Sequence, residues 1–488
     1  MKKEKKSSSL SFAGSILGFS LATWINALLY AISVMLVNIY VDKGVFGLFD
    51  LMITASTTLM SVVTLGFDHA YLRFFNEPPK GAVDRKQIAA LGLIVSITVL
   101  AVVSVLIFLL PDAIGRIFFE GRREIVLLVS LCITTLCMVV IRFFNITYRM
   151  QNNILLFTVV SILLQFFTRV FFIFGVFIHD DFRTIAIFNL CGLCAFVLVF
   201  LFLERKQMLP KKYGIQKEAY APLFKYSLGI MPSSVLLWGN QLVNKLFIGA
   251  YLGEAALGLF SFAALISQAL SILQGGFANF WSAYMFSNYE KERERIMKVH
   301  DLLVCVMMFL ICLLIIVSPL IFIVLSKFSE SRRIFSLLLA APLLMIIAET
   351  TVYGIEIAKK TILNSISSLI CVVTNILSCI LLVPSMKLTG AALSLVISTL
   401  AMFTFRTIMA QRLYRTIRSY TKTTLSLLFI AFLITAAYIF DSNYIIILII
   451  SLFTLLIYAF IYMKEIKTIL LLLQNYISKE KTQGSSTE

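Results

Sequence analysis

Runs of about 20 apolar residues recur along this chain from Ser11 to Tyr462. Each run is long enough to cross ~30 Å of hydrocarbon as an α-helix, whereas a transmembrane strand would show short segments of alternating polarity. Hydrophobic residues make up 60% of the 488 positions. A soluble chain of this length would divide into about three domains. This one is predicted to form a single all-α polytopic membrane body.

The apolar runs resolve into fourteen predicted transmembrane spans. The connections between the first and second spans and between the seventh and eighth are very short. The spans lie near 11–39, 45–67, 88–110, 125–147, 154–177, 185–203, 227–250, 255–280, 299–325, 334–357, 362–383, 389–410, 423–440 and 444–462.

The basic residues lie between the spans, so the net charge of +17 does not indicate a nucleic-acid-binding surface. Loops on one predicted side carry 30 Lys and Arg, loops on the other side carry 9, and Arg142, Arg169 and Lys245 complete the total of 42. The positive-inside rule therefore places both termini in the cytoplasm. The basic N-terminal residues precede an apolar run too long for a signal peptide, which is interpreted as the first span.

The predicted extramembrane segments are short. The outer loops reach only about 14 residues, which leaves little room for catalytic groups outside the cell. The chain has no phosphate-binding Gly-x-x-x-x-Gly-Lys-Ser/Thr motif. We therefore expect neither an enzyme nor a transporter that hydrolyses ATP itself, and no metal site.

A weak internal repeat has an offset of 211 residues. The segment from Tyr40 to Phe49 matches that from Tyr251 to Phe260 at four of ten positions. Six spans separate the two segments, so the copies are parallel, and transporters of this plan bind cargo between their lobes. The predicted organisation is two six-helix lobes around a central cavity, with two further helices. Its boundaries are 1–203 for the first lobe, 204–226 for a cytoplasmic linker, 227–410 for the second lobe, 411–462 for the additional helices and 463–488 for a cytoplasmic tail.

Four short strings, in this order and at this spacing, resemble a known family. They are Gly44-Val-Phe-Gly-Leu-Phe-Asp50, Leu65-Gly-Phe-Asp-His-Ala-Tyr-Leu-Arg73, Phe224-Lys-Tyr-Ser-Leu-Gly-Ile-Met-Pro232 and Gly258-Leu-Phe-Ser-Phe-Ala-Ala. Together with the 6+6+2 plan, they resemble the Wzx-type oligosaccharidyl-lipid flippases. This is the polysaccharide-export branch of the superfamily that also holds the multidrug exporters and the lipid II flippase.

The resemblance implies a flippase in the bacterial cytoplasmic (inner) membrane. Its cargo would be an undecaprenyl-pyrophosphate-linked oligosaccharide, moved by alternating access from the cytoplasmic to the outer leaflet for capsule, O-antigen, lipopolysaccharide or exopolysaccharide synthesis. The implied partners are this substrate, membrane lipids, a polysaccharide polymerase and chain-length machinery. The chain departs from its relatives in the seventh span, where Asn244-Lys245 replaces the Asp-Arg that many of them carry.

Three cations lie inside predicted spans, where each costs roughly 2.5–3.5 kcal/mol on insertion scales. Arg169 lies in the middle of the fifth span and Lys245 in the seventh, and both are expected to face a cavity that accepts an anionic cargo. Arg142 lies near the inner end of the fourth span. Either a cavity role or anchoring at the membrane interface is open for Arg142, because long cationic side chains can snorkel.

Neutral polar residues extend this predicted cavity. Asn240, Gln241 and Asn244 surround Lys245 in the seventh span. Asn26 and Tyr30 belong to a polar stripe on the first span. Such a stripe either lines the cavity or bonds to neighbouring helices.

Two sets of acidic residues complete the candidates. Glu349 and Glu356 share one face of the tenth span, where a carboxylate can pair with a cavity cation or bind H⁺ or Na⁺ as a coupling ion. Glu356 lies near the cytoplasmic rim, so solvation at the membrane interface is the alternative for it. Asp68 and Arg73 end the second span as either a cytoplasmic gate pair or an ordinary surface pair. No organic cofactor is implied.

Three alternatives stay open at this point. The same fold is compatible with a multidrug or organic-cation exporter, although that branch favours acidic cavities and usually has twelve helices. A peptidoglycan-precursor flippase would share the fourteen spans and the cations. A membrane polysaccharide polymerase or glycosyltransferase would belong to a different class, and the short outer loops count against it.

Overall fold

The computed structural model describes residues 25–75, 77–80, 85–118, 125–151, 153–208, 217–358, 360 and 362–467. Helices account for nearly all of these residues, and the described chain contains no β-strand. The start of the first predicted span, the centre of the 204–226 linker and most of the C-terminal tail lie outside the described residues.

Eleven helices among the described residues are long and apolar enough to cross a membrane. They begin with α2 (Lys43–Val63), and a shorter apolar helix, Ile25–Tyr40, precedes them. Once α9 (Lys217–Leu252) is added and the two arms of α16 (Ile362–Leu413) are counted separately, these elements follow the predicted spans in order. The interpretation as a helical membrane body is confirmed.

The chain groups into two compact units, Met1–Gly276 with Asn364–Met402, and Phe277–Leu363 with Phe403–Glu488. The predicted lobe boundaries, 1–203 and 227–410, remain a prediction. Elements that lie wholly in the first unit are α2, α3 (Phe67–Phe74), α4 (Arg85–Leu109), α5 (Pro111–Phe118), α6 (Ile125–Met150), α7 (Ile154–Arg169), η1 (Phe171–Phe177), α8 (Phe182–Met208), α9 (Lys217–Leu252) and α10 (Glu254–Ser267). The second unit holds α12 (Arg293–Val324), η2 (Ser326–Ser331), α13 (Arg332–Leu338), α14 (Ala340–Thr351), α15 (Tyr353–Ile357), α17 (Tyr420–Ile439) and α18 (Tyr444–Ile461). The helices α11 (Ala269–Asn288) and α16 (Ile362–Leu413) contribute to both units.

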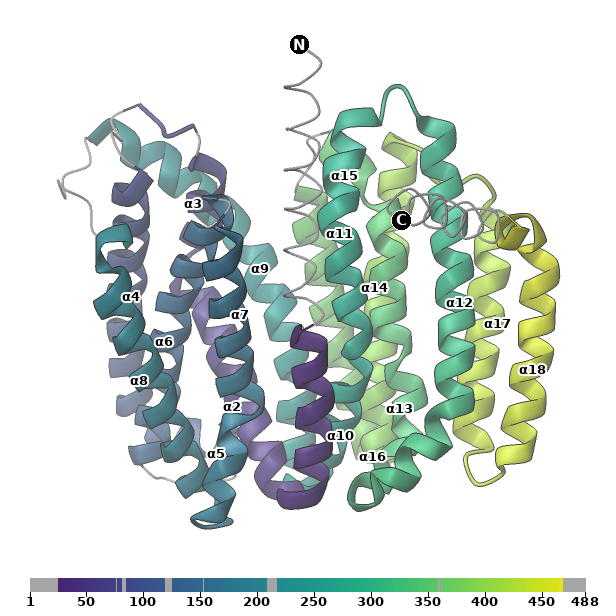
Figure 1. Cartoon of the computed structure of the whole chain (residues 1–488), viewed down its shortest axis with the longest axis horizontal. Coiled ribbons are helices and arrows are strands. Elements are labelled where there is room, and N and C mark those ends of the chain that lie inside the picture. Colours follow the sequence, from purple (N-terminus) through teal and green to yellow (C-terminus); the bar gives the residue numbers. More distant parts are fainter. Residues whose placement is uncertain are drawn as a thin grey trace, which may run out of the picture. The chain divides into compact units, whose positions relative to one another are not determined.

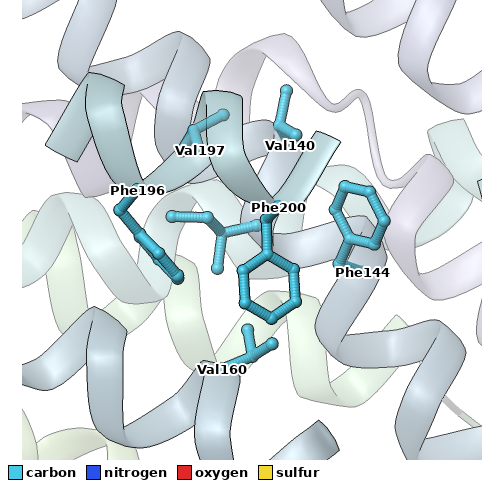
Figure 2. A pocket seen from close by; sticks show the side chains of 7 residues that line it. Val140, Phe144, Val160, Phe196, Val197 and Phe200 are labelled. Atoms are coloured by element: carbon cyan, nitrogen blue, oxygen red, sulfur yellow. The ribbon is translucent and has the colours of Figure 1, made fainter. Parts of the chain in front are cut away.

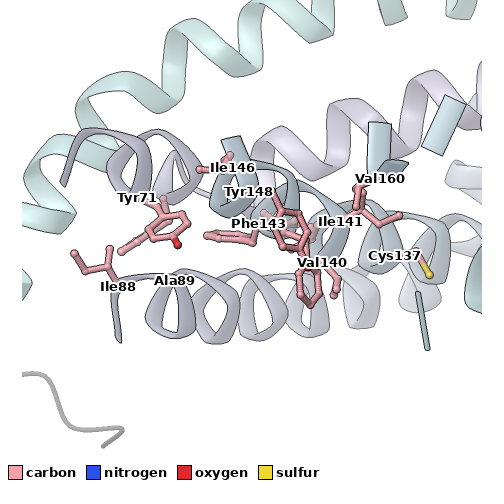
Figure 3. Close-up of a cluster of buried hydrophobic side chains, with 14 of the residues drawn as sticks. Tyr71, Ile88, Ala89, Cys137, Val140, Ile141, Phe143, Ile146, Tyr148 and Val160 are labelled. Carbon is pink, nitrogen blue, oxygen red and sulfur yellow. The ribbon is translucent and has the colours of Figure 1, made fainter. Parts of the chain in front are cut away.

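The first unit is built around α2 and α6, which are buried along most of their length. A continuous apolar cluster joins α3, α4, α6 and α8. Figure 3 shows Tyr71 of α3 and Phe143 of α6 within this cluster, with their ring centroids 6.2 Å apart. The Tyr71 hydroxyl is satisfied by a 2.9 Å hydrogen bond with Thr147 Oγ1, so this core contains no orphaned polar group at that ring.

Two glycines at equivalent positions of the sequence repeat meet where α2 packs on α10. A Cβ atom on Gly47 would lie 2.8 Å from the carbonyl oxygen of Glu254, and one on Gly258 would lie 1.8 Å from that of Lys43. With the offset of 211, Gly47 corresponds to Gly258 and Lys43 corresponds to Glu254. The contact is therefore reciprocal, as it is between two copies related by a two-fold axis. This geometry agrees with an internal repeat at this offset.

Two predicted spans are interrupted, and two others form one helix with a kink. The backbone explains each of these positions. The second span breaks between α2 and α3, where Leu65 and Gly66 adopt left-handed φ values of 47° and 78°. The fifth changes from α-helix to 3₁₀-helix directly after Arg169. The eleventh and twelfth spans are the two arms of α16, which separate at Lys387 (φ 53°). Gly390 allows the arms to turn tightly, because a Cβ there would lie 2.1 Å from the Leu382 carbonyl oxygen.

The second unit packs α12 against α14, α17 and α18. Figure 1 shows α12, α17 and α18 side by side. His300 of α12 links two of its neighbours. Its Nδ1 lies 2.7 Å from Thr350 Oγ1 of α14, and its Nε2 lies 3.1 Å from Thr423 Oγ1 of α17. Polar contacts of this kind hold membrane helices together where the hydrophobic effect does not.

Candidate functional site

A single carboxylate inside α2 holds two of the three cations that the sequence places within the membrane. Asp50 Oδ2 lies 2.6 Å from Lys245 Nζ of α9, and Asp50 Oδ1 lies 3.3 Å from Arg169 Nη1 of α7. Each cation therefore uses its own oxygen of the same carboxylate. Residues far apart in the sequence, on three different helices, form one charged cluster.

Lys245 is held by two side chains on the same face of α2. Besides its bond to Asp50, its ammonium group donates to Thr54 Oγ1 at 2.5 Å. Thr54 lies one helical turn after Asp50, so their side chains point the same way. The Thr54 hydroxyl in turn donates to the Asp50 carbonyl oxygen at 2.8 Å. This network sets the position of the ammonium group.

Arg169 is the last residue of α7, where the negative end of the helix dipole favours a cation. Its guanidinium lies over the ring of Tyr30, 5.2 Å from the ring centroid. Ser33, on the same helix as Tyr30, donates from Oγ to the Arg169 carbonyl oxygen at 2.6 Å. The helix Ile25–Tyr40 thus positions Arg169 through both its side chain and its backbone.

The charges of this cluster do not cancel. Lys245 and Arg169 share one carboxylate, which leaves an excess of one positive charge. An uncompensated charge in a low-dielectric interior is strongly unfavourable. The cluster is therefore suited to receive a further anion.

Lys245 and Arg169 differ in the exposed fraction of their side chains. The Lys245 side chain is only 6% exposed, whereas that of Arg169 is 19% exposed. Arg169 also keeps guanidinium donors beyond the one directed at Asp50, and its planar fork matches phosphate geometry. An incoming anion would therefore meet Arg169 first.

The third intramembrane cation, Arg142, is paired elsewhere. Its Nε and Nη2 atoms both lie 3.1 Å from Asp68 Oδ2. Arg73, the partner that the sequence suggested for Asp68, pairs instead with Glu77 at 3.3 Å on the exposed surface. Five residues along a helix place Asp68 and Arg73 on different faces, so the expected pair is replaced by two others. The Asp68–Arg142 pair joins α3 to α6.

The amides near Lys245 face a different helix. Asn375 of α16 donates from Nδ2 to Asn240 Oδ1 at 2.9 Å and to Asn244 Oδ1 at 2.6 Å. Asn244 also donates to the Ala391 carbonyl oxygen at 2.7 Å. These amides hold α9 against α16, as interhelical hydrogen bonds do in membranes.

The structure thus separates the predicted cavity residues. Arg169, Lys245 and Tyr30 come together, while Arg142, Asn240 and Asn244 serve other contacts. Gln241 is exposed on α9. Asn26, one turn before Tyr30, has a buried Oδ1 atom without a hydrogen-bond partner among the described residues.

Residues 13–280 of the chain match the family model of polysaccharide biosynthesis proteins. The chain belongs to this family. No curated protein sequence is detectably similar to it.

Solved structures show which fold this family member has. The lipid II flippase MurJ in an inward closed conformation aligns with a TM-score of 0.69 at 16% identity, over 92% of this chain and 99% of MurJ. An outward-facing multidrug transporter of the MATE family aligns with a TM-score of 0.54 at 16% identity, over 82% and 94% of the two chains. A transporter of the MOP superfamily from Pyrococcus furiosus aligns with a TM-score of 0.51 at 13% identity, over 82% and 95%. This family member therefore has the fold of the MOP superfamily, as predicted.

The two acidic residues predicted for ion coupling lie in the second unit. Glu349 of α14 and Glu356 of α15 are both half-buried. The buried Tyr353 ring lies between them in the sequence and makes an edge contact with Phe286, 5.7 Å between centroids. Arg406 lies within electrostatic range of Glu356. The roles of Glu349 and Glu356 in ion coupling or charge pairing remain a prediction.

An apolar pocket lies between α6, α7 and α8 (Figure 2). Its lining offers neither a charged nor a polar side chain, so it is not suited to a phosphate or a sugar. The lining residues are Val140, Ile141, Phe144, Val160, Phe196, Val197 and Phe200.

Asp50 is the member of this charged cluster that the sequence analysis did not single out. It closes the string from Gly44 to Asp50 and is an acidic residue inside the predicted second span, so the signal was present. The Asn244-Lys245 pair suggested that the acid beside Lys245 had been lost. The structure corrects this, because Asp50 supplies the acid from 195 residues earlier in the chain.

Proposed function

We propose that this protein is a flippase that moves an undecaprenyl-pyrophosphate-linked oligosaccharide from the cytoplasmic to the outer leaflet by alternating access. The observation that carries the proposal is the buried cluster of Lys245 and Arg169 on one carboxylate. A pyrophosphate is an anion that must cross a low-dielectric interior, and this requires compensating cations. Membership of the polysaccharide biosynthesis family supports a glycan as the other part of the cargo.

Asp50 has a clear part in such a cycle. A flippase returns empty after each delivery, and two unpaired cations would then be buried without compensation. Asp50 reduces this cost by serving as a resident counter-ion for both. When cargo arrives, its pyrophosphate would take up the excess positive charge through the more exposed Arg169, while Lys245 stays on Asp50 and Thr54.

The remaining candidate residues have roles in this proposal. Asp68 and Arg142, joined across α3 and α6, would act as the cytoplasmic gate. Glu349 and Glu356 would bind H⁺ or Na⁺ as the coupling ion. The protein would lie in the bacterial cytoplasmic membrane with both termini inside, and would deliver its cargo to a polymerase and chain-length machinery.

A second candidate is a peptidoglycan-precursor flippase. The observation that favours it is the likeness to the lipid II flippase MurJ, which extends over 99% of that chain. Both candidate cargoes carry a polyprenyl pyrophosphate, so the Asp50 cluster suits either. The glycan attached to the pyrophosphate distinguishes them.

The test is transport by the purified protein in sealed vesicles. Vesicles would carry either an undecaprenyl-pyrophosphate-linked oligosaccharide or lipid II in the inner leaflet, and an impermeant glycan-modifying enzyme outside would report arrival. We expect oligosaccharide-linked lipid to appear outside in vesicles with the native protein and not with Lys245→Ala.

The matched control is Arg332→Gln, which removes one cation from a half-buried ion pair with Asp441 (2.7 Å) in the second unit. It should transport like the native protein. Transport of lipid II alone would transfer the proposal to the peptidoglycan precursor. Transport of neither lipid, by a protein that binds organic cations, would reject both.

A further inference from the structure

A cluster of arginines lies in the second unit, where the start of α12, the end of α16 and the start of α17 come together. The segment 414–419 connects the end of α16 to the start of α17, and the first turn of α12 lies against it. Arg293, Arg415 and Arg418 are exposed here. None of these residues belongs to the Asp50 cluster or to the gate.

The backbone of segment 414–419 is fixed by the side chain of Gln411. Its Oε1 accepts from the backbone N–H groups of Thr416 (2.8 Å) and Ile417 (3.0 Å). Its Nε2 donates to Thr416 Oγ1 at 2.7 Å. Thr416 and Ile417 are buried, so this connection is an ordered part of the fold.

Two of the arginines are anchored to backbone carbonyls and aromatic rings. Arg415 donates from Nε to the Ile417 carbonyl (3.0 Å) and from Nη2 to the Arg418 carbonyl (3.0 Å), and it lies over the ring of Tyr420. Arg293 donates from Nε to the Arg415 carbonyl (3.2 Å) and lies over the ring of Tyr414. These contacts bring like charges together and leave several guanidinium N–H groups unused.

The opposite charges nearby are engaged with other groups. Glu292 pairs with Arg295 at 3.1 Å and accepts from the Tyr284 hydroxyl. Asp301 lies within electrostatic range of Arg418. In the part of the chain that the structure describes, neither Arg293 nor Arg415 has a carboxylate partner. Two neighbouring cations without an anion favour binding of one from outside.

The position of this cluster corresponds to the lipid headgroup level. The 32 residues of α12 extend about 48 Å, enough to reach the polar layer on both sides of a membrane. The positive ends of the α12 and α17 dipoles both lie at this surface. Tyr420 is 47% exposed beside the arginines, as aromatic residues are at membrane interfaces.

We propose that Arg293 and Arg415 bind the phosphate of an anionic phospholipid headgroup. The free guanidinium donors supply charge-assisted hydrogen bonds to the phosphate, while the exposed edge of Tyr420 contacts the glycerol region. Such a lipid would hold the start of α12 against the connection between α16 and α17. The proposal does not depend on the identity of the transported cargo.

The experiment uses the full-length protein in an uncharged detergent with added phosphatidylglycerol or phosphatidylcholine. Native mass spectrometry counts bound lipid, and the thermal unfolding midpoint is measured in parallel. We expect preferential binding of phosphatidylglycerol, with about fivefold weaker binding in Arg293→Gln, since one surface arginine contributes about 1 kcal/mol to anionic lipid binding. Arg293→Gln removes one hydrogen bond to the connection and the contact with the Tyr414 ring, whereas Arg415 makes two hydrogen bonds within the connection. Arg293→Gln therefore tests the site even if Arg415→Gln disturbs the connection.

The matched control is Arg333→Gln. Arg333 is exposed, and its Cζ atom lies 4.7 Å from the centroid of the Tyr438 ring. It follows the C-terminal end of α12, whereas Arg293 lies at the N-terminal end. The Arg333→Gln variant should bind phosphatidylglycerol like the native protein. Equal loss in both variants, or unchanged binding in Arg293→Gln, would overturn the site. Equally tight binding of water-soluble glycerol phosphate would overturn its assignment to a lipid.

Discussion

Lys245 Nζ lies 2.6 Å from Asp50 Oδ2, although 195 residues separate them in the chain. Arg169 shares the same carboxylate at 3.3 Å. This relationship gives the buried cations both a fixed position and an excess of one positive charge. The first two predictions test these consequences separately.

Replacing Asp50 should destabilise the protein. Asp50→Asn leaves Lys245 and Arg169 without a counter-charge, and breaking a buried pair in this way costs about 3–5 kcal/mol. We expect a lower thermal unfolding midpoint and less protein in the membrane. Asp50→Asn/Lys245→Met removes one cation together with the acid and should recover much of the stability without restoring glycan export. If Asp50→Asn alone proves as stable as the native protein, Asp50 is not the counter-ion.

Removing either cation should abolish glycan export while the protein remains abundant. We expect this for Lys245→Ala and Arg169→Ala, read as surface polysaccharide together with lipid-linked units that accumulate on the inner face. Lys245→Arg should retain more activity than Lys245→Ala, because the positive charge is preserved. Arg169→Lys should be partly active, since lysine lacks the bidentate geometry. Normal surface glycan from the double alanine variant would contradict a role for both residues.

The ion pairs at the two ends of α3 predict different outcomes for Arg142 and Arg73. Arg142→Gln removes the partner of the buried Asp68 and should reduce transport strongly. Arg73→Gln breaks only an exposed pair with Glu77, worth about 0.3–0.5 kcal/mol, and should be nearly silent. Asp68→Asn combined with Arg142→Gln should be no worse than Arg142→Gln alone, because both remove the same interaction. If Arg73→Gln reduces transport more than Arg142→Gln, Asp68 pairs with Arg73, as the sequence suggested.

The contact between α2 and α10 tolerates no side chain at two positions. Gly258→Ala would place a Cβ atom 1.8 Å from the Lys43 carbonyl oxygen, and Gly47→Ala would place one 2.5 Å from Gly258 N. Both should cost about 1–3 kcal/mol or more through overpacking, seen as a lower unfolding midpoint. Gly239→Ala is the matched control, because nothing lies within 4 Å of the added atom. If Gly239→Ala proves equally damaging, close packing is not the reason.

The charge bias of the loops predicts the topology. Reporter fusions within 204–226 and 411–422 should report the cytoplasm, and those within 111–124 and 326–333 should report the outside, because basic loops remain inside. Enzymatic reporters that are active on only one side of the membrane provide the measurement. A cytoplasmic signal from 326–333 would refute the parallel arrangement of the repeats.

Much of the fold could be predicted from one-dimensional patterns. Helical spans follow from apolar length, since backbone polar groups in lipid must be satisfied within each helix. The parallel repeat followed from the offset between Gly47 and Gly258, and their contact in space agrees with it. The separation of the eleventh and twelfth spans at Lys387 falls in the predicted loop 384–388. The interruptions of the second span at Leu65 and of the fifth after Arg169 were not predicted, because apolar composition does not record backbone conformation.

The candidate site divides in the same way. The sequence alone determined that Arg169 and Lys245 lie inside apolar spans, where their charge must be compensated. It did not determine by what, and it paired Asp68 with Arg73 because they are close along the chain. Only the tertiary structure decided that Asp50 compensates both cations and that Arg142 takes Asp68. The physical reason is that hydropathy belongs to each helix by itself, whereas the partner of a charge is decided by which helix faces pack together.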